Sequence, residues 1–200
     1  IRHGDVDNLE GTIYDGSISL SDLGKEKLRA LGRAFRDRGV MPDAIVSSDF
    51  LRAMQSAEEI RRNYLDLSLS IQPDSRLRDP HSPDLFGRTL AWLTEIVDPY
   101  SHPDLAGLRI ERPPRFTARM VAAIKDVIAK YQDQTVFVVS HGDPTAFAMW
   151  QLLNPEQPLP TLRELKAEKG RVPYLEKGEA WRILFDAHGK VIEHEHIARQ

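Results

Sequence analysis

Apolar residues recur with helical spacing in several segments of this 200-residue chain. Residues 21–38 place their apolar side chains on one face, which predicts an amphipathic helix with Ser21 as its N-cap and Gly39 as its stop signal. The same spacing predicts helices over residues 50–64, 116–131 and 145–153, and a shorter helix over residues 89–97.

Strands are predicted where apolar runs are too short for helices. Residues 43–48 are apolar in their middle, and residues 67–72 alternate apolar with polar positions, as a half-buried strand does. The run TVFVVS at residues 135–140 is uninterrupted, so we expect a strand that is buried on both faces and lies at the centre of the sheet. Residues 180–197 predict a terminal hairpin that turns at residues 187–189.

Strands that alternate with helices predict an α/β fold, here a three-layer α/β/α sandwich with a mostly parallel central sheet. We expect residues 1–200 to form a single domain, with an insertion around residues 80–115 and a loop region over residues 154–180. In such folds ligands bind beyond the carboxyl ends of the strands. Ile1 would be the last residue of a first strand, so the residues after it emerge at the binding edge.

Composition narrows the class of protein. The formal net charge of -3 shows no excess of basic residues, which argues against a general nucleic-acid or acidic-membrane surface. The chain has no cysteine and no apolar run long enough to cross a bilayer, so we expect a soluble, cytoplasmic protein without disulfides. Because position 1 is Ile and not an initiator methionine, we expect that an upstream segment is missing, which leaves a targeting segment open. The oligomeric state is not determined by these patterns.

Positively charged and imidazole side chains follow the predicted strands. Arg2 and His3 leave the first strand, His141 leaves the strand over residues 135–140, and Arg52 lies on the first turn of the next helix. Because parallel strands end at one edge of a sheet, these side chains can form one cluster of donors. Its natural occupant is a phosphoryl group, since arginine forks match phosphate oxygens without help from a metal. A neutral imidazole in such a cluster can attack phosphorus.

Transfer of a phosphoryl group from an alcohol also requires a proton donor. A carboxyl group near the phosphoryl dianion has a raised pKa and can serve as that donor. Asp79 follows the alternating strand and opens the insertion, so we predict that it is the general acid. Asp84 is close enough in sequence to be its rival.

Five stretches of the chain resemble motifs of the histidine phosphatase superfamily, the phosphoglycerate mutase-like group, branch 1. They occur in the family's order over most of the chain: RHGD, SLSDLGKEKLRALG, SSDFLRAMQSAE, RLRDPH and VVSHGDP. The resemblance implies a phosphoglycerate mutase-like sandwich and metal-free phosphoryl transfer with no cofactor. It implies that His3 is the phosphorylated nucleophile, that Arg2 and Arg52 bind the phosphate, and that His141 is the second phosphate-binding histidine.

The chain departs from the family pattern at two positions. Members often carry threonine where this chain has Val6, so a hydroxyl contact to phosphate is missing, and Asn8 is our candidate to replace it. The position of the family's usual proton donor corresponds to Asp79 in place of the commoner glutamate, which shortens its reach by one methylene.

These observations predict a phosphatase that hydrolyses phosphomonoesters, whether small molecules or phosphoproteins, through a phosphohistidine on His3. A phosphoglycerate mutase-type enzyme is the first alternative. It would need an enclosing lid and a second set of anion contacts, and the insertion here is modest. A non-catalytic phosphoryl-binding scaffold is the second alternative. The sequence does not name the substrate: sugar phosphates, phosphoglycerate-like acids, nucleotides and phosphoproteins all stay open.

The other polar and aromatic candidates favour structural roles. His194 and His196 have a spacing that can bind a metal, but with no third ligand in view we interpret them as a polar strand face and predict no metal site. Three arginines of the insertion favour a solvated loop over a second anion site: Arg109, Arg112 and Arg115. Two aromatic residues either wall the crevice or join the core: Phe86 and Trp92.

Overall fold

The computed structural model describes residues 1–64, 68–167 and 174–198. Its α-helices are α1 (Asp22–Asp37), α2 (Leu51–Arg61), α3 (Leu90–Ile96), α4 (Pro113–Lys130), α5 (Gly142–Leu153) and α6 (Leu162–Ala167). Its strands are β1 (Ala44–Ser47), β2 (Ile71–Pro73), β3 (Val136–Val139), β4 (Ala180–Phe185) and β5 (Val191–Ile197). Single 3-10 turns occur at η1 (Arg62–Tyr64), η2 (Ser75–Leu77), η3 (Pro83–Leu85) and η4 (Pro103–Leu105).

The central sheet is parallel, with strand order β2-β1-β3. Among these three strands β1 is the middle one, and β3, the run predicted to lie at the centre of the sheet, is the last of the three. β3 is nevertheless internal, because the N-terminal segment pairs along its other side. The His3 nitrogen donates to the Ser140 carbonyl at 3.0 Å, and the Ser140 nitrogen donates to the Ile1 carbonyl at 2.9 Å. The predicted first strand thus ends beside β3, and both emerge at the same edge.

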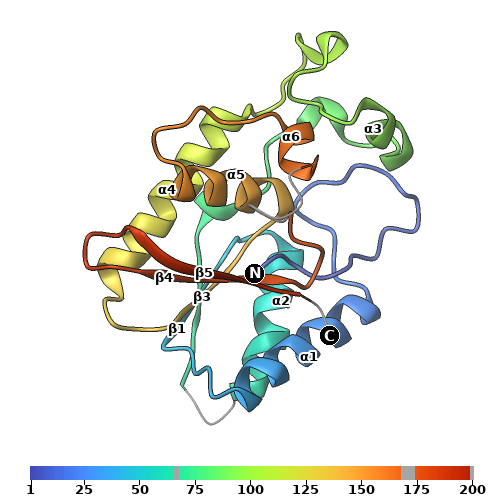
Figure 1. The fold of residues 1–200 in the computed structure, drawn as a ribbon. Helices are drawn as coiled ribbons and strands as arrows, with labels where there is room; N and C mark the ends of the chain where they lie inside the picture. Colours follow the sequence, from blue (N-terminus) through green and yellow to red (C-terminus); the bar gives the residue numbers. More distant parts are fainter. Residues whose placement is uncertain (65–67, 168–173, 199–200) are drawn as a thin grey trace.

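Helices cover both faces of this sheet, which confirms the predicted three-layer arrangement (Figure 1). Successive residues of a strand point to opposite faces. Ile45 and Phe137 pack with buried residues of α1 and α2, whereas Val46 and Val138 pack with residues of α4 and α5. Ile45 is fully buried and Val46 is 5 % exposed, so the sheet is enclosed from both sides.

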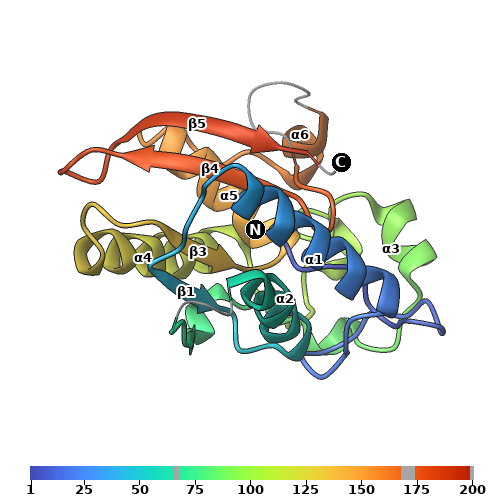
Figure 2. The same ribbon diagram turned by 90° about the horizontal axis from the view of Figure 1, so that it is seen from below.

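The predicted terminal hairpin is present as the antiparallel pair β4 and β5 (Figure 2). Asp186 and Lys190 close its turn, and Gly189 adopts a φ of 76°, a left-handed conformation that glycine takes without strain. The start of the hairpin is hydrogen-bonded to the N-terminal segment, because the Arg2 nitrogen donates to the Glu179 carbonyl at 3.0 Å. The segment that carries Arg2 and His3 is therefore held between β3 and the start of β4.

Two predicted elements differ from the structure. The strand predicted over residues 67–72 is shorter and shifted, since β2 covers Ile71–Pro73; residue 67 lies outside the described residues, and residues 68–70 form no strand. The loop predicted over residues 154–180 contains the helix α6. Leu162 and Leu165 of α6 are each 2 % exposed and join the apolar cluster around α5, so tertiary packing stabilises a helix of only six residues.

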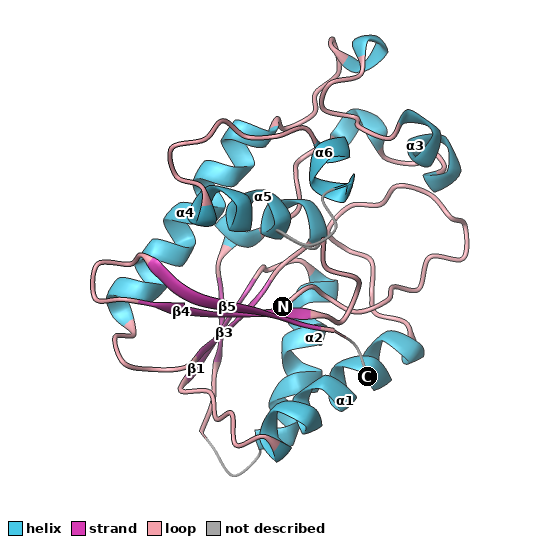
Figure 3. Cartoon of the chain, viewed as in Figure 1, coloured by secondary structure: helices cyan, strands magenta, loops and turns pink. Residues whose placement is uncertain are grey.

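The connection between β2 and α4 contains α3 and three 3-10 turns, joined by irregular segments that Figure 3 shows as loops. It has its own small apolar cluster, which is built around the buried residues Leu85, Leu105 and Ile110. Thr89, the N-cap of α3, also pairs with the loop after the first strand, because it forms an antiparallel bridge with Thr12. None of the helices in the described ranges combines the length and the apolar character that a bilayer crossing requires.

Close backbone packing fixes the turn after His3 against α1. Ser21 caps this helix as predicted, with its Oγ accepting a hydrogen bond from the Gly24 nitrogen at 3.1 Å. A Cβ on Gly24 would collide with the Asp5 carbonyl oxygen and lie 2.8 Å from the Asp5 nitrogen. A Cβ on Gly4 would lie 2.9 Å from the Gly24 carbonyl oxygen. At both positions glycine is therefore required because a side chain has no room, and not because of the backbone conformation.

We expect Gly24→Ala to destabilise the protein although alanine favours helices. The new methyl group must displace the backbone of Asp5, and such overpacking costs about 1–3 kcal/mol, against a helix-propensity gain of about 1 kcal/mol. The measurement is the free energy of unfolding in urea. Gly107→Ala is the control, because a Cβ there meets no atom within 4 Å. Equal stability of the two variants would contradict the expectation.

Candidate active site

His3 lies at the centre of the predicted cluster, and its hydrogen bonds define its tautomer. Its Nδ1 is 2.8 Å from the Gly4 carbonyl oxygen, which can only accept, so Nδ1 carries the proton. Nε2 therefore carries the lone pair, and the Arg52 Nε donates to it at 3.3 Å. Burial lowers the pKa of His3 well below its usual range, and the charges of Arg52 and Arg2 lower it further. The ring is thus neutral, with a nucleophilic nitrogen that faces an arginine.

Arg52 joins the cluster from the first turn of α2, as predicted. It is 1 % exposed, and besides His3 it donates to the Asp15 carbonyl at 2.9 Å and to the Asp79 carboxylate at 3.0 Å. The ring of Phe50 lies 5.0 Å from its guanidinium carbon, and the ring of Tyr14 lies 5.1 Å from it. These contacts hold the guanidinium in one orientation, so its charge is positioned before any ligand binds.

His141 lies beside His3, with ring centroids 5.1 Å apart, although 138 positions separate the two residues. Its Nε2 is 2.9 Å from Ser48 Oγ, which also accepts from the Phe50 nitrogen at 3.3 Å. Ser48 can then donate its own proton to Nε2, which leaves the imidazole proton on Nδ1. Nδ1 is buried and has no hydrogen-bond partner among the described residues. This donor is available to a ligand.

Arg2 supplies the second buried donor without a partner. One terminal nitrogen donates to the Leu175 carbonyl at 2.6 Å, and the guanidinium carbon lies 5.3 Å from the centre of the Tyr174 ring. Its Nε has no partner within the part of the chain that the structure describes. Unsatisfied buried donors are costly, so two of them beside His3 indicate a site for an acceptor-rich group.

The structure separates the two candidate carboxyl groups. Asp79 Oδ2 contacts Arg52 and lies 3.9 Å from His141 Nδ1, and burial raises the pKa of its carboxyl, which Arg52 opposes. Its side chain is still 35 % exposed, whereas His3 is 3 % exposed, so the cluster opens to solvent at Asp79. Asp84 instead pairs with Arg109 at 2.6 Å, and that hydrogen bond lowers its pKa. Of the two, only Asp79 is near His3.

Arg119 holds the segment of Asp79 in place and was not predicted from the sequence. It projects from α4 and donates to the carbonyls of Arg76, Arg78 and Asp79, at 2.7, 2.7 and 3.2 Å. Glu111 fixes its guanidinium through two further hydrogen bonds, at 2.9 and 2.8 Å. Its sequence position is an ordinary helical one, so no local pattern identifies it.

Asn8 lies in the loop after the first strand, and its carboxamide bonds the backbone of that loop. Its Nδ2 donates to the Thr12 carbonyl at 2.9 Å, and its Oδ1 accepts from the Thr12 nitrogen at 3.3 Å. Both polar atoms are thus engaged in shaping the loop that brings Asp15 to Arg52. A contact from Asn8 to phosphate stays a prediction.

The histidines of the last strand have contacts outside the histidine cluster. His196 Nε2 is 2.9 Å from Glu179, and both His194 and His196 pack on the ring of Trp181. Among the described residues, no group of three or more potential ligands has the arrangement of a metal site. Two of the three arginines of the insertion have partners of their own: Arg109 pairs with Asp84, and Arg112 donates to the carbonyls of Tyr100 and Leu105 at 2.7 and 3.0 Å. The third, Arg115, is exposed.

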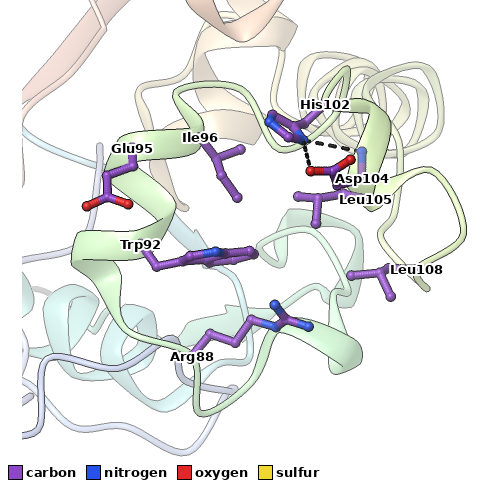
Figure 4. Close-up of a pocket in the computed structure, with 8 residues that line it drawn as sticks. All are labelled: Arg88, Trp92, Glu95, Ile96, His102, Asp104, Leu105 and Leu108. Atoms are coloured by element: carbon purple, nitrogen blue, oxygen red, sulfur yellow. Dashed lines mark hydrogen bonds and ion pairs between the residues drawn. The ribbon is translucent and has the colours of Figure 1, made fainter.

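The insertion has a cavity of about 490 Å³ with a different lining from the histidine cluster. Trp92 forms one of its walls, with the Arg88 guanidinium carbon 4.6 Å from the ring centre (Figure 4). Ile96, Leu105 and Leu108 supply the apolar part of the lining. Trp92 therefore lies in the insertion's own apolar cluster, while Phe86 is 42 % exposed.

Comparison with known proteins agrees with this geometry. The family model of the histidine phosphatase superfamily (branch 1) matches residues 1–185. The chain belongs to this superfamily. A broad-specificity phosphatase of Saccharomyces cerevisiae is 24 % identical over 147 residues, which are 71 % of this chain and 64 % of the yeast protein. The chain therefore spans less than two thirds of the length of that relative.

Solved structures of the same fold superpose along the whole chain. YhfR of Bacillus stearothermophilus has a TM-score of 0.76 at 24 % identity, covering 100 % of this chain and 93 % of its own. A mycobacterial glucosyl-3-phosphoglycerate phosphatase, solved with VO3, has a TM-score of 0.72 at 23 % identity and coverages of 98 % and 94 %. Phosphoserine phosphatase of Entamoeba histolytica, solved with 3-phosphoglyceric acid, has a TM-score of 0.73 at 18 % identity and coverages of 100 % and 95 %. These similarities establish the histidine phosphatase fold.

Proposed function

We propose that this histidine phosphatase superfamily member hydrolyses phosphomonoesters through a phosphohistidine on His3, without a metal. The observation that carries the proposal is the orientation of His3. Gly4 holds the proton on Nδ1, so the lone pair of Nε2 faces the cations and the unpartnered donors around it. A neutral imidazole with a fixed lone pair is a competent nucleophile toward phosphorus.

In the first step the Nε2 lone pair attacks phosphorus and the ester P–O bond breaks. Arg2, Arg52 and His141 donate to the nonbridging oxygens and stabilise the negative charge of the transition state. Asp79 gives its proton to the leaving oxygen, which departs as an alcohol. The raised pKa of Asp79 keeps that proton available.

In the second step the Asp79 carboxylate removes a proton from water, and the resulting hydroxide attacks the phosphohistidine. The N–P bond breaks, inorganic phosphate leaves, and His3 returns to its neutral form. The exposure of Asp79 supports this role, because water must reach the carboxylate. The names of the yeast relative and of the two structural relatives solved with ligands, which are all phosphatases, support hydrolysis over transfer to a second substrate position.

The test is to trap the intermediate. The protein is incubated with para-nitrophenyl phosphate, quenched in alkali to preserve phosphohistidine, digested, and analysed by mass spectrometry. We expect one added phosphoryl group on the peptide that contains His3, together with release of inorganic phosphate. A phosphoenzyme that returns its phosphoryl group only to an organic acceptor would indicate a mutase. Substrate binding with neither phosphoenzyme nor phosphate would indicate a scaffold.

A further inference from the structure

Asp143 connects the two loop regions that border the histidine cluster. It lies in the first turn of α5, two residues after His141. Tyr100, from the insertion, donates its hydroxyl to Asp143 Oδ2 at 2.5 Å. Tyr174, from the segment before β4, donates its hydroxyl to Oδ1 of the same carboxylate. Neither step of the proposed hydrolysis uses any of these three side chains.

This trio adjoins the charged groups of the proposed active site. A Cβ on Gly142, the residue before Asp143, would collide with the Tyr174 hydroxyl and lie 3.0 Å from the Arg2 guanidinium carbon. Burial raises the pKa of Asp79, Arg52 opposes that rise, and the negative charge of Asp143 adds to it. The Tyr174 ring also contacts Arg2, 5.3 Å from its guanidinium carbon. Asp143 and both tyrosines are partly exposed. The trio therefore borders the space that a leaving group occupies beside Asp79.

The hydrogen bonds of the trio leave it with acceptors only. A phenol has one proton to donate, and both phenols donate theirs to Asp143. Burial raises the pKa of each tyrosine well above its usual range, and Asp143 raises it further, so neither phenol ionises near neutral pH. What the trio offers to a ligand is the set of oxygen lone pairs that these bonds leave free, together with one negative charge.

We propose that Asp143, Tyr100 and Tyr174 form a leaving-group subsite that accepts hydrogen bonds from a hydroxyl or ammonium group and disfavours a leaving group with a second anionic group. This proposal rests on the proposed phosphatase function and narrows its substrate class. It favours phosphate esters of polyols or amino alcohols over phosphoglycerate-like acids.

The nearby cations do not reverse this charge preference. Arg2 and Arg52 are committed to the transferred phosphoryl group. Lys166 contacts the face of the Tyr174 ring, 5.2 Å from its centre, and not its hydroxyl edge. Burial and the charge of Arg2 lower the pKa of Lys177, whereas the charge of Asp5 raises it. The polar edge of the trio therefore presents negative charge to the leaving group.

The test compares esters that differ in the leaving group alone. The three esters are glycerol 3-phosphate, O-phosphoethanolamine and 3-phosphoglycerate. All are alkyl phosphates, so the leaving oxygen of each needs a proton to a similar degree as the P–O bond breaks. For the wild-type protein we expect kcat/KM to be at least about tenfold higher for each of the first two than for 3-phosphoglycerate, because a like charge beside Asp143 is repelled. Asp143→Asn should reduce this ratio by about tenfold. Asp84→Asn, the same change at a carboxyl group that pairs with Arg109 away from the cluster, should leave it unchanged.

Tyr100→Phe and Tyr174→Phe provide the second measurement if Asp143→Asn fails to fold. Each removes a phenol oxygen together with the hydrogen bond that orients the Asp143 carboxylate. The subsite then lacks its fixed acceptor geometry, so kcat/KM for glycerol 3-phosphate should fall severalfold relative to para-nitrophenyl phosphate, which has no leaving-group donor. A wild-type preference for 3-phosphoglycerate, or a ratio that neither Asp143→Asn nor the tyrosine variants alter, would overturn the subsite. Hydrolysis of none of the four esters would instead overturn the proposed function itself.

Discussion

His3→Ala should slow the turnover of para-nitrophenyl phosphate by about four orders of magnitude or more, as expected when a covalent nucleophile is removed. We expect that the neighbouring His141 does not take over, because its Nε2 is 2.9 Å from Ser48 Oγ and its Nδ1 lies 3.9 Å from the Asp79 carboxylate. The measurement is steady-state release of para-nitrophenol.

Two controls make this result specific to the nucleophile. His188→Ala removes an exposed histidine in the hairpin turn and should leave the turnover rate unchanged. His3→Gln keeps a polar side chain of similar size, and thermal unfolding of both His3 variants shows whether the fold persists. A folded His3→Ala variant with more than about a hundredth of the wild-type turnover rate would refute a phosphohistidine on His3.

Asp79→Asn should slow esters with poor leaving groups far more than esters with good ones. An alkoxide needs a proton as the P–O bond breaks, and general acid catalysis contributes about 10²–10⁴-fold to such steps. Hydrolysis of glycerol 3-phosphate should therefore fall within that range. The rate at which para-nitrophenyl phosphate forms the phosphohistidine should change much less, because nitrophenolate departs without a proton. Single-turnover measurements isolate that step from the later attack by water.

The pH dependence of the same reaction provides an independent check. The acid must be protonated before the transfer, so kcat/KM for glycerol 3-phosphate should fall as the pH rises through the raised pKa of Asp79. This alkaline limb should be absent in Asp79→Asn. Asp84→Asn, with its carboxyl group paired to Arg109 in the wild type, should keep it. Equal slowing of both esters, or an unchanged alkaline limb, would place the proton donor elsewhere.

The amino-acid sequence alone determined the local elements and the main cluster. The capped amphipathic helix after Ser21, the run at residues 135–140 and the terminal hairpin are all signalled by short-range periodicity, and the structure contains each of them. The motifs around His3, Arg52 and His141 lie directly after strands. Because parallel strands end at one edge, their order along the chain was enough to predict that these side chains meet.

Only the tertiary structure decided which partners each side chain has. Asp79 and Asp84 have the same side chain and lie close together in the sequence, but Asp79 contacts Arg52 and Asp84 contacts Arg109. The support of Asp79 by Arg119 and the junction of two loops at Asp143 also left no local signal, whereas the unpredicted helix α6 does have one, the capping box formed by Thr161 and Glu164. Both the support and the junction depend on contacts between residues that are distant along the chain, and such contacts are set by how packed layers fit together. Periodicity reports the face of an element that is buried, and it does not report what lies against that face.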